Sequence, residues 1–434
     1  MSNVDFVVLT LAIVMAVGVV TFLFSERTHI SYVPILIVLG MLVGPILGIL
    51  NRSISHQLFN YARVFGLVII LFAEGHNLKW SLLKRHVATI TLLDTVGLLV
   101  TALIAAVAFS LLLHVPFLVG FLFGAIISAT DPATLIPLFK QHNVNEDMRS
   151  VIVTESIFND PLGIVLTILA IALIVPQADS AHFLESIASV TTLYPAAFIF
   201  FLYEVSVSIA IGIGLGLLGY WLIHVLHLEP FSEVYSLALA FGGFAIGEAA
   251  QASGYLVVTV IAIVLGNHEV FFKAHDRVEN AERVISSERH FNEILSDFAA
   301  VLIFILLGAS MDLKSLVSSL AIGSVIALIV VFIARPVATL SILPLGRWNA
   351  RQYGFMALEG PRGVVPSALA GLPLALGLSF HNQQLIGWGE SILAVTVITI
   401  LVSVILETLW ASALNRWWLG AGKSSKVTVG STAG

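Results

Sequence analysis

The chain has 434 residues, of which 58% are hydrophobic and 11% are Asp, Glu, Lys or Arg, with no Cys and a formal net charge of −6. Soluble domains carry about 25% charged residues, so much of this apolar surface must face lipid, which excludes a soluble enzyme. The negative charge excludes a nucleic-acid-binding protein, and the absence of Cys excludes disulfides and thiolate metal sites.

Apolar segments follow one another along almost the whole chain. A helix that crosses a bilayer needs about 17–25 apolar residues, and we find thirteen such segments. They are 5–24, 31–50, 58–78, 87–113, 117–139, 151–175, 196–226, 232–252, 255–272, 294–311, 316–345, 352–377 and 387–415. The sequence therefore predicts an all-α polytopic membrane protein with thirteen transmembrane helices, followed by a disordered tail at 420–434.

The distribution of Lys and Arg predicts the orientation. With the N-terminus outside, the inward loops hold 15 Lys and Arg and the outward loops hold 3. Positive residues concentrate in cytoplasmic loops, and one missed span would invert every later loop. We therefore predict a protein of the cell membrane with an external N-terminus and a cytoplasmic C-terminus.

The fifth segment contains Thr130-Asp131-Pro132 at its centre. Pro132 has no N–H and moves Asp131 away from helical angles, so the helix is predicted to stop and restart there. Asp131 suits the N-cap of the second half-helix. Capping alone is one interpretation, but a carboxylate at this depth is costly, which favours a functional role.

The twelfth segment repeats this device with Glu359-Gly360-Pro361-Arg362-Gly363. Interrupted helices at the fifth place of segments one to six and of segments eight to thirteen indicate inverted repeats around a central site. A lone guanidinium at this depth needs an anion, and Glu155 is the expected partner of Arg362. Arg335, in the eleventh segment, is predicted to form a structural ion pair.

The sixth segment gathers polar side chains on one helical face. Glu155, Ser156, Asn159 and Asp160 fall within about 140° of one another. With Asp131 and the nearby backbone carbonyls, these groups form a set of oxygen donors. Such a set suits a hard cation such as Na⁺ rather than zinc.

These three motifs together closely resemble the NhaP-type sodium/proton antiporters of the cation/proton antiporter superfamily. The resemblance implies an NhaA-like fold in which helices five and twelve cross where both unwind. It also implies a homodimer. Its core bundle would comprise 87–175 and 294–415, its interface helices 1–86 and 232–293, and its linking helix 196–226.

The resemblance also implies a role for individual residues. The Na⁺ ligands would be Asp160, Asp131, Ser156 and the backbone of Thr130, with Glu155 reaching the ion through water. Asn159 implies electroneutral exchange of one proton for one Na⁺. The two buried arginines of the family are Arg335 and Arg362, with Arg362 placed beside Glu155. Glu74 would control the site or line a cytoplasmic funnel.

The expected activity is secondary active exchange of Na⁺, and also Li⁺, for H⁺, in which both ions compete for Asp160 and Asp131. No nucleotide or cofactor motif is present, so the energy must come from ion gradients and the chain is not predicted to be an enzyme. The alternatives are a K⁺/H⁺ antiporter or a proton-coupled transporter of organic solutes. An intramembrane aspartyl protease is disfavoured because its Gly-x-Gly-Asp pattern is missing.

Overall fold

The computed structural model describes residues 3–28, 30–131, 146–267 and 278–414. All regular elements in these ranges are helices, and they contain no strand. Eight of the described helices are long and apolar enough to cross a membrane, and four apolar helical segments are shorter. The prediction of an all-helical, multi-pass membrane protein is therefore confirmed, whereas the count of thirteen spans stays a prediction.

The helices follow one another with short connections. Up to residue 188 they are α1 (Asn3–Thr28), α2 (Tyr32–Met41), α3 (Arg52–Asn77), α4 (Trp80–Leu92), α5 (Leu98–Leu113), α6 (Phe117–Ser128), α8 (Glu146–Ile174) and α9 (Asp179–Ala188). Beyond it they are α10 (Leu193–Val225), α11 (Ser232–Ala249), α12 (Gly254–Gly266), α14 (Val278–Ser310), α15 (Leu313–Ile329), α16 (Arg335–Thr339), α17 (Ala350–Leu358), α18 (Val364–Ala370), α19 (Leu372–Ser379) and α20 (Gln383–Leu414). Short π-helical segments at Leu42–Ile46, Leu93–Gly97 and Val330–Ala334 continue α2, join α4 to α5 and join α15 to α16.

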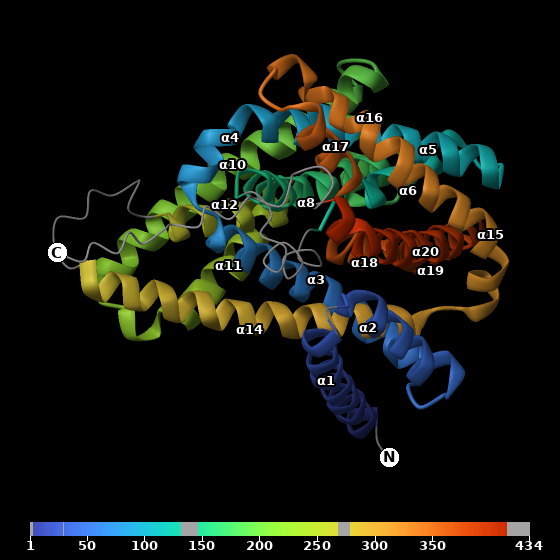
Figure 1. The fold of residues 1–434 in the computed structure, drawn as a ribbon, viewed down its shortest axis with the longest axis horizontal. Coiled ribbons are helices and arrows are strands. Elements are labelled where there is room, and N and C mark those ends of the chain that lie inside the picture. Colours follow the sequence, from blue (N-terminus) through green and yellow to red (C-terminus); the bar gives the residue numbers. More distant parts are fainter. Residues whose placement is uncertain (1–2, 29, 132–145, 268–277, 415–434) are drawn as a thin grey trace, which may run out of the picture.

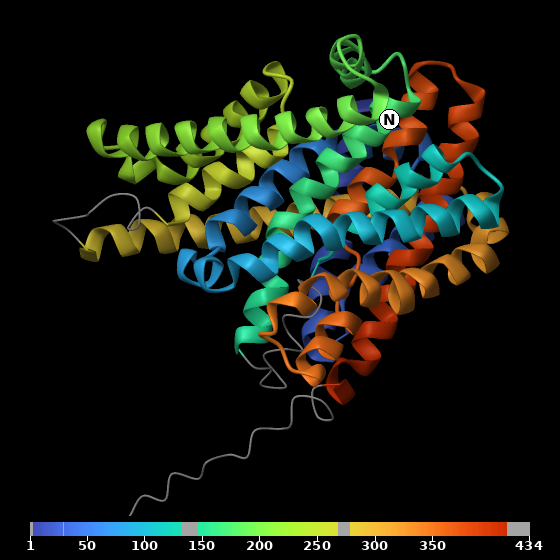
Figure 2. The same cartoon turned by 90° about the horizontal axis from the view of Figure 1, so that it is seen from above.

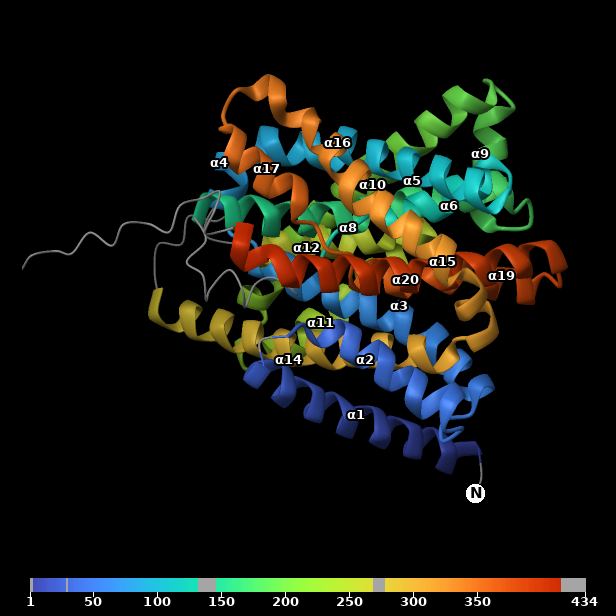
Figure 3. The ribbon, with the colours of Figure 1, turned by 45° about the vertical axis from the view of Figure 1, so that its right-hand side comes forward.

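Most of the long helices run in roughly one common direction, as Figure 3 shows. α3 packs along α14 and α12, α5 packs along α6, and α15 packs along α20. α10, α11 and α12 lie towards one side of the molecule, and α15, α19 and α20 lie towards the other (Figures 1 and 2). The predicted division into a core bundle and interface helices assigns these two sides different roles and stays a prediction.

Close helix contacts depend on small residues. At Gly44, in the π-helical end of α2, an added Cβ would lie only 2.6 Å from the Cα of Ala309 in α14. Lipid tails are as apolar as Leu side chains, so helices in a membrane associate by close backbone packing rather than by hydrophobic burial. Glycine at this point allows α2 to lie directly against α14.

Two segment boundaries differ from those predicted. The helix expected at 294–311 begins sixteen residues earlier, since α14 runs from Val278 to Ser310, and Glu279/Arg283-type spacing at its charged start suits a helix. The segment expected at 117–139 is helical only to Ser128, where α6 ends. Hydropathy marks the apolar part of a helix and not its ends, which explains both differences.

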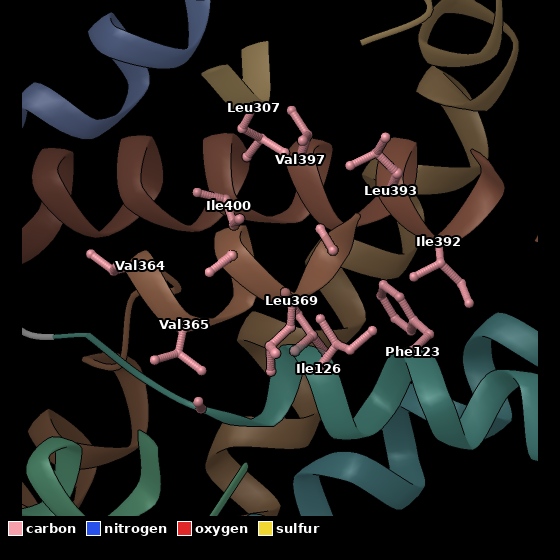
Figure 4. Close-up of a cluster of buried hydrophobic side chains, with 14 of the residues drawn as sticks. Phe123, Ile126, Leu307, Val364, Val365, Leu369, Ile392, Leu393, Val397 and Ile400 are labelled. Atoms are coloured by element: carbon pink, nitrogen blue, oxygen red, sulfur yellow. The ribbon is translucent and has the colours of Figure 1, made fainter. Parts of the chain in front are cut away.

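α18 is held between α6 and α20 by apolar side chains. Figure 4 shows Val365 and Leu369 of α18 beside Ile126 of α6, with Ile400 of α20 on the other side. All four side chains belong to the largest buried hydrophobic cluster. This packing fixes the short helix that follows the second interruption.

Candidate functional site

The two predicted helix interruptions are present and they meet. α6 ends at Ser128, and Ala129 is extended with φ −65° and ψ 143°. α17 ends at Leu358, and regular helix resumes at Val364. The backbone N–H of Asp131 donates to the carbonyl of Pro361 at 2.7 Å. The crossing implied by the resemblance is therefore observed at the level of the backbone.

Each interruption provides a charged cap for the helix on the other side of the crossing. The Asp131 carboxylate accepts a hydrogen bond from the N–H of Val364, the first residue of α18, at 3.1 Å. Arg362 Nη1 donates to the carbonyls of Ser128 and Ala129, at the end of α6, at 2.7 and 3.0 Å. A helix N-terminus favours negative charge and a C-terminus favours positive charge, so both contacts stabilise the crossing.

This arrangement refines the capping role predicted for Asp131. The half-helix that it was expected to cap begins at residue 132, and 132–145 lie outside the described residues. The carboxylate instead caps α18. Gly363 makes room for it, since a Cβ at that position would overlap the Asp131 carboxylate.

The predicted pairing of Arg362 with Glu155 is wrong. Glu155 forms a bidentate pair with Arg335, whose Nη1 donates to Oε1 and whose Nη2 donates to Oε2, the latter at 2.9 Å. The helix interruption deprives the last carbonyls of α6 of their helical partners, and Arg362 supplies the missing donors. The sequence could not distinguish the two arginines, because both lie in apolar segments far from Glu155.

The polar face of α8 holds the first interruption in place. Ser156 Oγ donates to the carbonyl of Thr130 at 2.6 Å. Asn159 makes two contacts with the same residue: its Nδ2 donates to Thr130 Oγ1 at 2.6 Å and its Oδ1 accepts from the Thr130 N–H at 3.1 Å. Asn159 is therefore a positioning residue for the backbone of Thr130.

Asp160 differs from its neighbours because one of its oxygens is not bonded. Its side chain is buried, and Oδ1 has no hydrogen-bond partner among the described residues. Asp131 and Glu74 lie within electrostatic range of it. A buried carboxylate oxygen without a donor, beside hydroxyl and carbonyl oxygens, is a place where a proton or a hard cation can bind.

The described residues contain no group of three or more His, Asp or Glu side chains arranged to hold a metal ion. Any cation at the crossing would therefore be bound by a mixed set of carboxylate, hydroxyl and backbone oxygens. Such a set suits a weakly held ion that passes through the protein.

A cavity of about 600 Å³ connects the crossing with the surface. Buried Asp131 and Ser156 line it, as do exposed Lys79 and Glu293. Glu74 lies in its wall, as expected for a residue of a funnel, although its role stays a prediction. Asp131 is thus the charged group of the crossing that an ion entering by this cavity meets.

Two residues of α20 at the crossing were not predicted as site residues. Ser403 Oγ accepts a hydrogen bond from the N–H of Arg362 at 3.2 Å, and Glu407 Oε2 accepts from the N–H of Gly360 at 2.7 Å. They satisfy backbone donors that the interruption leaves without helical partners. Their four-residue spacing in an apolar segment, which places both on one helical face, was the signal that could have found them.

Comparison with known proteins decides the family. Residues 10–417 match the family described as "Sodium/hydrogen exchanger, transmembrane". The chain belongs to this family. It is 32% identical to "Probable Na(+)/H(+) antiporter 2" over 93% of this chain and 95% of that protein. It is 33% identical to "Na(+)/H(+) antiporter 1" over 95% and 96%, and both relatives are from Methanocaldococcus jannaschii.

A solved structure of this exchanger family has the same fold. The sodium proton antiporter MjNhaP1 from Methanocaldococcus jannaschii superposes with a TM-score of 0.84 at 31% identity, over 96% of this chain and 100% of that one. The family match confirms the resemblance to the cation/proton antiporters. It also confirms that the chain is a transporter and not an enzyme.

Proposed function

We propose that this exchanger-family protein is a secondary active antiporter that exchanges Na⁺ for H⁺ across the cell membrane. The observation that supports this most directly is the pair of buried carboxylates at the crossing. Asp160 has an oxygen without a described partner, and Asp131 lines a cavity that reaches the surface. The sodium/proton antiporters among the relatives, by their names, favour Na⁺ as the cation.

In this proposal Na⁺ is the substrate, and its ligands are the carboxylates of Asp160 and Asp131, the hydroxyl of Ser156 and the backbone carbonyl of Thr130. Glu155 was expected to approach the ion through water. Its two oxygens instead accept hydrogen bonds from Arg335, so we assign it to holding the bundle together.

Sodium and protons compete for the same carboxylates. At low pH the site holds a proton that Na⁺ cannot displace, and at high pH no proton is bound for the return step. Asn159 is neutral, so one Na⁺ is exchanged for one H⁺ and the exchange is electroneutral. The transport step is alternating access of the crossing to the two sides of the membrane.

The cavity is the cytoplasmic entrance in this proposal. Lys79 and Arg149 line it, and both belong to loops that the distribution of positive charge places inside. The external N-terminus, the cytoplasmic C-terminus, the homodimer and transport of Li⁺ complete the proposal, each resting on the sequence and the resemblance.

The test is proton movement in liposomes that contain the purified protein and a pH-sensitive dye, after addition of Na⁺, Li⁺ or K⁺ in turn. We expect Na⁺ and Li⁺ to move protons and K⁺ to give only the leak of empty liposomes. Movement with K⁺ alone would instead identify a K⁺/H⁺ antiporter. No movement with any cation would refute the proposed exchange.

Competition predicts a particular acid limb. Because one proton is exchanged for one ion, the apparent Na⁺ affinity should weaken about tenfold per pH unit while the maximal rate stays nearly constant. A constant affinity with a falling maximal rate would show that a separate pH switch controls transport.

A further inference from the structure

A second group of buried acidic side chains surrounds Arg335, and the proposed exchange does not use it. Its carboxyl groups belong to Asp94, Glu155, Glu359 and Glu407, each at most 2% exposed. Asp94, Glu155 and Glu407 lie within electrostatic range of Arg335, and Glu359 lies within range of both Glu407 and Arg335. They come from four elements: the π-helical segment Leu93–Gly97, α8, the end of α17 and α20.

The basic groups near this cluster are committed to other partners. Arg335 donates to Glu155 and to the carbonyls of Met356 and Glu359. Arg362, the other arginine within range of Glu407, donates to the end of α6. The cluster therefore holds four carboxyl groups against two guanidinium groups, and full ionisation would leave two negative charges without compensation.

The hydrogen bonds show which carboxyl groups lack support for a charge. Within the described part of the chain, both oxygens of Asp94 and both oxygens of Glu359 have no hydrogen-bond partner. Glu407 accepts from the N–H of Gly360 at 2.7 Å. A buried carboxylate without donors becomes neutral by taking up a proton, which removes the cost of desolvating its charge.

We propose that Glu359 and Glu407 form a second proton-binding site, separate from Asp131 and Asp160, that holds at least one proton in the transporting protein. The ligand is a proton and not a metal ion, because the nearby Arg335 guanidinium repels a free cation. The pair Glu155–Arg335 and the carboxyl of Asp94 complete the charged surroundings of this site.

The position of the two residues connects this proton with the crossing. Glu359 is the first residue after α17, and Glu407 accepts from the N–H of the next residue, Gly360. The same interruption continues to Arg362 and Gly363, which contact α6 and Asp131. Loss of the proton places two negative charges side by side at one end of the interruption, and their repulsion displaces the segment that holds the crossing.

The inference rests on the proposed exchange for its transport readout, and it assigns a different cause to each limb of the pH profile. Competition at Asp160 and Asp131 sets the acid limb. Proton loss from Glu359 and Glu407 lowers the maximal rate on the alkaline limb. A variant that removes one of the two charges should therefore move only the alkaline limb.

Glu407→Gln and Glu359→Gln are the test variants. The amide oxygen introduced by Glu407→Gln can still accept from the N–H of Gly360, and the Glu359 side chain makes no described hydrogen bond that would be lost. The maximal Na⁺-driven rate is measured in liposomes over a series of pH values. At the pH where the alkaline limb of the wild type is half-maximal, each variant should be about twofold faster, and the acid-limb slope of Na⁺ affinity should be unchanged.

Glu248→Gln is the matched control, because Glu248 on α11 also accepts from a backbone N–H, that of Gly254, at 3.0 Å. Its alkaline limb should coincide with that of the wild type. The proposal is wrong if neither test variant moves the alkaline limb, or if the control moves it equally.

A second measurement does not depend on transport. Infrared spectra of the Asp160→Ala protein, recorded at neutral and alkaline pH, should show loss of a protonated carboxyl band, and adding Glu359→Gln or Glu407→Gln should remove that change. Absence of the band in Asp160→Ala would overturn the proton site. A wild type that moves no protons with Na⁺, but retains the band in this variant, would refute only the proposed exchange.

Discussion

Two carboxylates of α8 face different surroundings although they lie five residues apart. Glu155 and Asp160 are equally buried, each 2% exposed. Both oxygens of Glu155 accept hydrogen bonds from Arg335, whereas Oδ1 of Asp160 has no partner in the described structure. Burial therefore does not separate a structural carboxylate from a binding one. The deciding property is whether protein donors already occupy its oxygens.

Asp160→Ala tests the binding side of this comparison and should have the largest effect. Exchange should be abolished, because the ion loses its principal ligand. Stability should fall little, since no described donor to Oδ1 is lost and a charge leaves the membrane interior. Proton movement in liposomes and thermal unfolding in detergent provide the two measurements. Transport above the level of empty liposomes would remove Asp160 from the site.

Asp131→Asn separates ion binding from capping at the crossing. An amide oxygen can still accept from the N–H of Val364, so the thermal midpoint should stay close to that of the wild type. Loss of the negative charge should nevertheless weaken Na⁺ binding strongly. Asp131→Ala is the matched variant that removes both functions, and it should also lower the midpoint. Equal midpoints for the two variants would show that the cap contributes nothing.

Glu155→Ala tests the structural side and should reduce stability rather than ion affinity. It leaves Arg335 buried without its anion, and breaking a buried pair costs about 3–5 kcal/mol. A double-mutant cycle with Arg335→Ala should show strong coupling. The corresponding cycle with Arg362→Ala is the control and should be nearly additive. The opposite pattern would restore the pairing of Glu155 with Arg362.

Asn159→Asp asks whether position 159 sets the stoichiometry. The variant loses the Nδ2 donor to Thr130 Oγ1, but the Thr130 hydroxyl can donate to the new carboxylate, so the loss of stability should be about 1 kcal/mol. A second titrating carboxyl beside Asp160 should make exchange sensitive to membrane voltage. If the rate in the variant remains independent of an imposed potential, the stoichiometry is set elsewhere.

Both interruptions could be predicted from the sequence because proline and glycine act locally. Pro132 and Gly360-Pro361 prevent regular helix whatever surrounds them, and the polar face of α8 follows from helical period alone. Partner choice is different, since it depends on which side chains the fold brings together. No local pattern indicates that Arg362 caps α6 or that Asp131 caps α18, because these contacts join segments more than 200 residues apart.

Asp312 extends the comparison to a carboxylate outside the membrane-spanning helices, where the smallest effect is expected. It is the N-cap of α15 and accepts from the N–H and the hydroxyl of Ser315 at 3.0 and 2.9 Å. Its carboxyl also lies 3.5 Å from Arg52, an exposed pair that adds little. The backbone hydrogen bond from Ser315 is the main reason that the pKa of Asp312 lies below its usual value.

The sign of the resulting pH dependence follows from that lowered pKa. The unfolded chain binds the proton more readily than the folded one, so the stabilisation by Asp312 is complete above its ordinary pKa of about 4 and is lost as the pH falls through the lower folded value. Asp312→Ala should reduce stability at neutral pH by about 0.5–2 kcal/mol, as for other N-caps, and the difference from wild type should shrink in acid. Thermal midpoints of the two proteins across this range provide the measurement. Sodium affinity should be the same in both, because Asp312 has no contact with the crossing, and a change in affinity would mean that α15 takes part in ion binding.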